Sequence, residues 1–167
     1  MLVWEAARKS ARDIRANMAI SQAPTSSELE RLAEFYDAVV FYRDLEDGLS
    51  GFTLKQANSN PEIFININEP IPRQKFTLAH EIGHIIERGS YANDSDYSFM
   101  DYRNTNKYDL HEFFADEFAG ALLMPSEEFL PIYKEEGEFA TAMKFGVTVS
   151  AVQKRAARLD KNPDVAA

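Results

Sequence analysis

The chain has 167 residues, of which 45% are hydrophobic and none is cysteine, and its formal net charge is −9. This size allows one domain with a proper core, while the lack of cysteine excludes disulfides, thiolate metal sites and a cysteine nucleophile. The negative charge argues against broad electrostatic attachment to nucleic acid, since a phosphate backbone would repel the molecule as a whole. We expect a cytoplasmic protein, because a chain without cysteine suits a reducing compartment and no segment resembles a signal peptide or a membrane span.

The first part of the chain predicts two helices and then short strands. Residues 5–20 form an amphipathic helical pattern, and residues 25–36 open with Ser/Thr capping residues followed by glutamates. Residues 37–45 and 49–56 have the composition of short strands. The clearest strand is expected over 61–68, where isoleucines alternate with other residues.

The second part of the chain is mostly helical. Periodicity begins after the proline-marked turn EPIPRQ and runs to about Glu87, and a strong helix is predicted over 108–124. Between them, residues 88–108 are rich in Asn, Asp, Ser and Tyr, so we expect an excursion with little regular structure. This order predicts an α+β fold with about three strands, a domain over 1–125 and a C-terminal helical extension over 126–167.

The segment FTLAHEIGHIIE contains the pattern His-Glu-x-x-His. Residues four apart on a helix share one face, so His80 and His84 can direct both imidazoles at one cation. Glu81 lies beside this face and is the candidate general base, taking a proton from the attacking water. Gly83 costs the helix about 1 kcal/mol relative to alanine, which is easier to understand if another backbone or a substrate comes close there. The competing interpretation is a chance match to a short pattern.

A catalytic zinc usually takes three protein ligands, so a third ligand is needed. The extended three-histidine pattern fails, because Glu87 and Ser90 stand at its glycine and histidine positions. We expect Glu87 to be a solvated charge. The better candidate is Glu112 on the second strong helix, with Asp116 accepting a hydrogen bond from the outer N–H of a ligating histidine. His111 remains an alternative as a ligand, a proton donor or a surface residue.

Two segments of the chain, RQKFTLAHEIGH and the later E-x-x-A-D-x-F-A-G-A-L-L-M-P, occur with the strand IFININ and the tail F-G-V-T-V-S-A-V-x-x-R-x-x-x-L. Together they closely resemble the ImmA/IrrE metallopeptidases, zincins of the glutamate-ligand type, from about Thr25 onward. The resemblance implies a zincin-like fold and one zinc ion or another divalent metal, with Glu81 as the base. The ligands that it implies are His80, His84 and Glu112. Asp116 stands where the family most often has asparagine, and both residues offer a hydrogen-bond acceptor.

The family implies a cytoplasmic endopeptidase of narrow specificity. Its usual target is a helix-turn-helix repressor of the XRE type, whose cleavage switches on stress-response or mobile-element genes. We expect the scissile peptide to pair by β-augmentation with the strand around residues 63–68. The residues expected to line that pairing are Ile63, Ile65, Asn66 and Ile67. Possible oxyanion donors are Tyr91, Tyr97, Tyr102 and Tyr108.

The C-terminal segment offers a rival hypothesis. FATAMKFGVTVSAVQKRAARL resembles a helix-turn-helix, with Ala142 as the small residue, Gly146 at the turn and Val152 as the apolar anchor. This end is also locally basic, through Lys144, Lys154, Arg155, Arg158 and Lys161. The chain could therefore be a DNA- or repressor-binding regulator with a structural or inactive metal site. Direct DNA binding is not the preferred hypothesis, because one helix pair is a small footprint on an acidic chain, and no membrane partner is expected.

Overall fold

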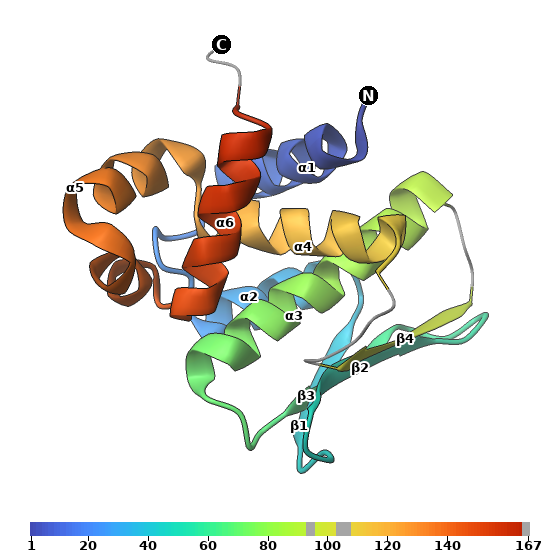
Figure 1. Cartoon of the computed structure of the whole chain (residues 1–167). Helices are drawn as coiled ribbons and strands as arrows, with labels where there is room; N and C mark the ends of the chain where they lie inside the picture. Colours follow the sequence, from blue (N-terminus) through green and yellow to red (C-terminus); the bar gives the residue numbers. More distant parts are fainter. Residues whose placement is uncertain (93–95, 103–107, 165–167) are drawn as a thin grey trace.

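The computed structural model describes residues 1–92, 96–102 and 108–164 and has the expected α+β order (Figure 1). The elements are α1 (Val3–Met18), α2 (Ser26–Phe35), β1 (Val39–Arg43), β2 (Leu49–Lys55), β3 (Glu62–Asn66), α3 (Ile71–Ile86), a π-helical turn (Glu87–Ala92), β4 (Tyr97–Tyr102), α4 (Leu110–Leu123), α5 (Ser126–Phe145) and α6 (Val149–Lys161). The N-cap of α2 is Thr25, whose side chain accepts a hydrogen bond from the backbone N–H of Glu28. Predicted helices and strands agree with these bounds within a few residues, except at β4.

The sheet has four strands in the order β1-β3-β2-β4, where about three were expected. β1 is parallel to β3, and the pairs β2–β3 and β2–β4 are antiparallel. β4 lies inside the segment expected to lack regular structure, so that prediction is wrong over Tyr97–Tyr102. The physical reason is that the hydrophobic pattern of this strand is the reverse of the usual one. Met100 and Tyr102 are exposed, while the polar Asp101 is mostly buried, so the alternation of residues does not mark a strand.

One face of the sheet is covered by α3, with α2 beside it (Figure 1). Ile63 and Ile65 of β3 point into this layer and have no exposed surface. A Cβ atom on Gly51 of β2 would lie 2.8 Å from the Cγ2 atom of Thr77 on α3. Glycine at this position therefore lets α3 lie close beneath the sheet, which brings the His-Glu-x-x-His helix near β2 and β4.

Further layers follow, as α4 packs on α3 and α1 packs on α4 (Figure 1). Helices α3 and α4 approach each other closely at Gly83, where a Cβ atom would lie 3.1 Å from the Cα of Ala115 and 3.1 Å from the ring of Phe118. Another backbone does come close to Gly83, as its presence in a helix suggested. The separation of the two helices that carry the candidate ligands is set at this contact.

The C-terminal helices share the hydrophobic core of the rest of the chain. Ala142 and Val152 are buried, and Gly146 ends α5 with a φ of 64°, as expected for a helix-turn-helix. α5 also bends at Gly137, whose φ is 85°. Residues of α5 and α6 belong to the same core cluster as α1, α3 and α4. Among the described helices, none has the length and apolar character needed to cross a bilayer.

Candidate metal centre

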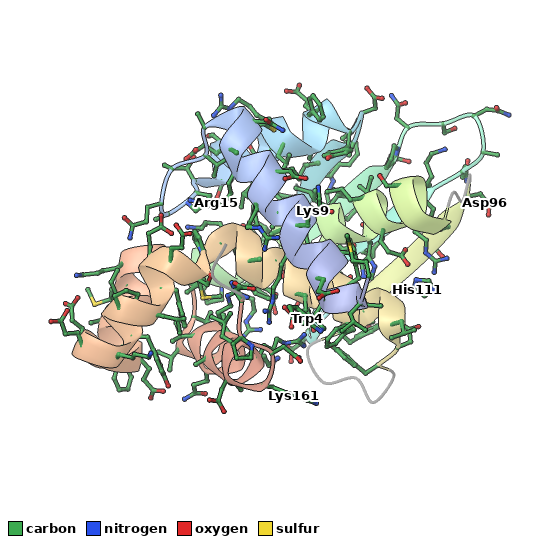
Figure 2. The ribbon with its side chains drawn as sticks, turned by 90° about the horizontal axis from the view of Figure 1, so that it is seen from above. Trp4, Lys9, Arg15, Asp96, His111 and Lys161 are labelled. Carbon is green, nitrogen blue, oxygen red and sulfur yellow. The ribbon has the colours of Figure 1, made fainter. Side chains whose placement is uncertain are left out.

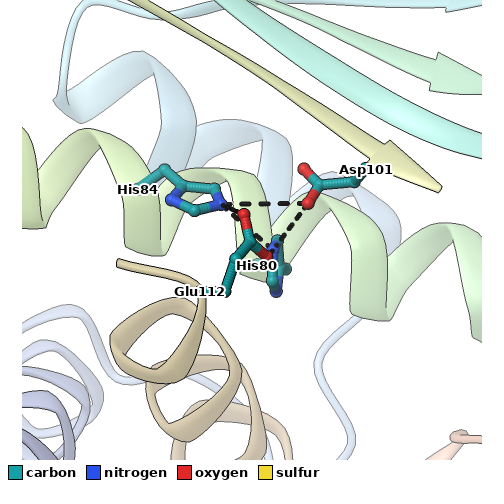
Figure 3. A group of neighbouring side chains, drawn as sticks. All are labelled: His80, His84, Asp101 and Glu112. Carbon is teal, nitrogen blue, oxygen red and sulfur yellow. Dashed lines mark hydrogen bonds and ion pairs between the residues drawn. The ribbon is translucent and has the colours of Figure 1, made fainter. Parts of the chain in front are cut away.

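Four side chains from three elements meet at one point, and we refer to them as the metal cluster (Figure 3). Helix α3 contributes His80 and His84, α4 contributes Glu112, and β4 contributes Asp101. Each offers one ligand atom, and these atoms all lie within 4.8 Å of one another. Imidazole nitrogens with carboxylate oxygens form a donor set that zinc and similar divalent metals accept.

The spacing of the ligand atoms fits a metal ion. The Nε2 atoms of His80 and His84 are 3.1 Å apart, and each lies 3.0 Å from an oxygen of Glu112. Two atoms that each lie about 2.0–2.1 Å from a tetrahedral zinc are roughly 3.3–3.4 Å apart, so only small shifts are required. The Oδ2 atom of Asp101 is buried without a hydrogen-bond partner among the described residues. A cation would compensate this buried carboxylate.

Asp116 meets His80 from the side opposite the centre. Its Oδ1 lies 2.8 Å from Nδ1 of His80, while its Oδ2 accepts a hydrogen bond from the hydroxyl of Tyr108 at 2.9 Å. Arg158 lies 3.5 Å from the same Oδ2. A histidine that donates its Nδ1–H to a carboxylate keeps Nε2 free to bind a metal, so Asp116 orients His80 toward the centre.

Burial and neighbouring charges shift the pKa values of the residues in the metal cluster in different directions. Burial opposes a charge on His80, but the carboxylates of Asp101 and Asp116 outweigh it and raise the pKa of His80 well above its usual range. Burial lowers the pKa of His84 to about 4, so that this imidazole is neutral at pH 7. Burial would raise the pKa of Glu112, yet its hydrogen bonds to the two histidines lower it. The carboxylate and the neutral imidazole are both ready to bind a metal.

Glu81 lies on α3 next to the cluster and has no exposed surface. Its Oε2 accepts a hydrogen bond from the hydroxyl of Thr53 on β2, while its Oε1 has no hydrogen-bond partner among the described residues. Thr53 is a site residue that the sequence does not reveal, since a threonine in a strand 28 positions away from Glu81 matches no known spacing. The sequence does not reveal Asp101 either, because its segment lacks the alternation of apolar residues that marks a strand.

His111 lies outside the metal cluster, at the first turn of α4 (Figure 2). Its Nδ1 is 2.5 Å from Oε1 of Glu87, and it is not among the four residues whose ligand atoms converge. Glu87 is not the solvated charge that we expected, because its side chain is only 12% exposed. The sequence pattern missed this pair because it joins two helices.

The prediction that a substrate pairs with the strand around residues 63–68 is wrong in this topology. β3 is paired on one side by β1 and on the other by β2, so neither edge of its backbone is free. Ile63 and Ile65 are buried, Asn66 donates a hydrogen bond to the carbonyl of Leu49, and Ile67 lies beyond the end of β3. The strand next to the cluster at the edge of the sheet is β4.

The four tyrosines differ in their surroundings. Tyr102 donates a hydrogen bond to Glu46 at 2.8 Å, away from the cluster. Tyr108 contacts Asp116 and is therefore linked to His80 through one carboxylate. Tyr97 is half-buried, and the side chain of Tyr91 lies outside the described part of the structure.

Comparison with known families decides the classification of the chain. The model of the Peptidase_M78 family, the IrrE N-terminal-like domain, matches residues 33–157. The chain belongs to this family. The match agrees with the ImmA/IrrE resemblance and spans every residue of the metal cluster. Membership in Peptidase_M78 supports a metallopeptidase role, and a search among curated proteins gave no match.

Proposed function

We propose that this member of the IrrE N-terminal-like family is a zinc-dependent endopeptidase that cleaves a specific regulatory protein. The observation that carries the proposal is the convergence of His80, His84 and Glu112 from two helices, with Glu81 beside them. The substrate that we propose is a helix-turn-helix repressor of the XRE type, whose cleavage would derepress stress or mobile-element genes. That choice rests on the family resemblance, since the site geometry specifies a reaction and not a target.

In this proposal each side chain has a separate task. His80, His84 and Glu112 would hold the zinc, which when bound polarises the scissile carbonyl and activates water. Glu81 accepts the proton of the attacking water at Oε1, the oxygen with no hydrogen-bond partner among the described residues, and passes it to the leaving amine. Thr53 holds the other carboxylate oxygen in place, and Asp116 fixes the orientation of His80.

The substrate would bind as an extended strand along β4. This strand pairs only with β2 in the described sheet, and it contributes a residue to the metal cluster. An added strand at this edge would satisfy the backbone groups of β4 and bring its own carbonyl groups near the centre. We therefore propose that the substrate pairs with β4 and not with β3.

The rival hypothesis of DNA binding receives little support from the basic residues of the tail. Arg155 is 3% exposed and donates to the carbonyl of Met124, while Arg158 is paired with Glu117 and hydrogen-bonded to Tyr108. Both arginines therefore serve internal packing between α6 and α4. The exposed basic residues of the segment are Lys144, Lys154 and Lys161, and Lys144 is paired with Glu136. Three lysines supply few positive charges with which to bind a phosphate backbone.

The test is cleavage of a purified XRE-type repressor from the same organism, by wild type and Glu81→Gln protein loaded with zinc. We expect Glu81→Gln to retain zinc and to lose activity by about 100-fold or more, because it removes a general base. Glu62→Gln is the control, since it removes an equal charge from an exposed position on β3. Full activity in Glu81→Gln would refute the peptidase mechanism. Cleavage of an unrelated unfolded protein but not of the repressor would refute only the proposed target.

A further inference from the structure

We propose that Asp101 is a fourth protein ligand of the metal and that it holds the centre closed in the resting protein. The inference rests on the metal centre of the proposed function, and it adds a residue from the sheet to ligands that otherwise come from helices. The three-ligand pattern of the sequence does not include this residue.

The position of Asp101 is that of a ligand and not of a supporting carboxylate. Its Oδ1 lies 3.0 Å from Nε2 of His80 and 3.9 Å from Nε2 of His84, the two nitrogens that face the centre (Figure 3). A carboxylate that only orients a ligating histidine contacts the other ring nitrogen, as Asp116 does at Nδ1 of His80. Asp101 therefore shares with Glu112 the side of the imidazoles where a metal would bind.

The backbone of the sheet directs Asp101 to this place. Tyr102 pairs with Leu49 while Asp101 pairs with Gly51, so Ser50 is an extra residue in a β-bulge of β2. Bulges re-aim side chains of the paired strand and are common beside functional sites. Because Gly51 also allows the sheet to lie close to α3, the carboxylate on β4 can reach the histidines. The approach of Asp101 is thus a property of strand register and helix packing.

A fourth protein ligand would make the metal site a closed one, with no coordination position left for water or substrate. Zinc sites with four protein ligands are closed, whereas catalytic sites keep one position for water or substrate. His80, His84 and Glu112 already supply three, so Asp101 would take the position that the reaction needs. Glu81 and His84 have no exposed surface, and the side chains of His80 and Asp101 are 9% and 13% exposed, so the centre is largely covered while β4 stays in place.

The same strand connects closure to substrate binding. β4 is the edge strand along which we propose that the substrate pairs, and it also carries Asp101. Pairing of a peptide with β4 would act directly on the backbone next to the fourth ligand. A substrate that shifts β4 withdraws Asp101 and opens the coordination position, whereas a short peptide that cannot pair leaves the centre closed.

The experiment compares wild type, Asp101→Ala, Asp101→Asn and Asp96→Ala proteins, each loaded with Zn²⁺ or Co²⁺. Asp96→Ala is the matched control, because it removes the same charge from an exposed residue just before β4. Zinc affinity is measured by competition with a chelator, and the ligand field by the visible absorption of the Co²⁺ protein. Azide is then added as a small ligand that can occupy only an open position. Thermal denaturation checks that each variant is folded.

We expect Asp101→Ala to bind zinc at least tenfold more weakly, because even carboxylates that only support a ligand contribute about 10–100-fold to metal affinity, while Asp96→Ala matches wild type. We also expect azide to change the Co²⁺ spectrum of Asp101→Ala but not that of wild type. A wild-type spectrum that responds to azide overturns the closed centre even if no variant folds. Equal zinc affinity and equal spectra in wild type and both Asp101 variants overturn the fourth ligand and leave the three-ligand centre intact. Failure of wild type to bind either metal overturns the proposed function itself.

Discussion

Among the single residues around the metal cluster, Thr53 offers the sharpest test of how the general base is held. Thr53 and Glu81 are both fully buried, and the hydroxyl of one donates to the carboxylate of the other. Thr53→Val keeps the shape of the side chain but removes this donor, which leaves a buried carboxylate poorly satisfied. We expect kcat for repressor cleavage to fall roughly 10–100-fold, with zinc affinity unchanged, as measured by cleavage kinetics and chelator competition.

Replacing Thr53 with serine distinguishes the contribution of the hydroxyl to activity from that of the methyl group. Thr53→Ser retains the donor and should recover most of the activity lost in Thr53→Val. If both variants lost activity equally, packing of the methyl group would be responsible and the hydrogen bond to Glu81 would have no special role.

The part of the site that the sequence predicts is the part carried by helices. The spacing of His80 and His84 places them on one helix face with Glu81 beside it. Glu112 is preferred over His111 because of its spacing from Asp116 and because of the family resemblance. Thr53 and Asp101 could not be predicted, because they lie on two strands whose pairing depends on contacts distant in sequence. A spacing rule exists for residues on one helix and none exists for residues that meet through sheet register.

Between elements, the contact of α3 with α4 at Gly83 decides how far apart the ligand-bearing helices lie. Gly83→Ala should raise the intrinsic stability of α3 by about 1 kcal/mol. However, the added Cβ would lie 3.1 Å from the backbone of Ala115, which the helices can relieve only by separating. We expect overpacking to dominate, with a net loss of about 1–2 kcal/mol in urea denaturation and weaker zinc binding because Glu112 moves away from the histidines.

Gly89→Ala is the matched control for this substitution. Gly89 lies in the π-helical turn after α3, and a Cβ atom there would have no atom within 4 Å. We expect its free energy of unfolding to stay the same or to rise by up to about 1 kcal/mol, because alanine gains helix stability there without overpacking, with unchanged zinc affinity. A Gly83→Ala protein that is as stable as wild type and binds zinc equally well would show that the helix contact tolerates a methyl group.

The elements themselves were predictable where local pattern and burial agree. The alternation of isoleucines marks β3 because Ile63 and Ile65 face the core. β4 escapes the same rule because its inward Asp101 faces a polar centre and its outward Met100 and Tyr102 are apolar. The order of the strands in the sheet cannot be predicted from local sequence patterns either, since β3 lies between β1 and β2 through a parallel pairing with β1. The error about the substrate strand follows directly from that missing order.

Across the whole molecule, one network of charges connects the first helix to the end of the chain. Arg8 of α1 is paired with Glu117 of α4 at 3.0 Å and with Asp164 at 2.9 Å, and it donates to the carbonyl of Asn162. Arg158 of α6 is paired with the second oxygen of Glu117. Arg158 also lies beside Asp116, so the network borders the support of His80. The segments 1–125 and 126–167 are therefore joined by a shared core and by buried ion pairs.

Arg8→Leu tests whether this network holds the ends of the chain together. Arg8 is 1% exposed, so its loss removes the buried partner of Glu117 and the anchor of residues 162–164. We expect a destabilisation of about 3–5 kcal/mol in urea denaturation, because a buried charge is left with half of its partners. Lys9→Leu changes the next residue, which is labelled in Figure 2 and whose pair with Asp13 is exposed, and should cost no more than about 1 kcal/mol. Equal losses in the two variants would mean that the terminal helices are held by apolar packing alone.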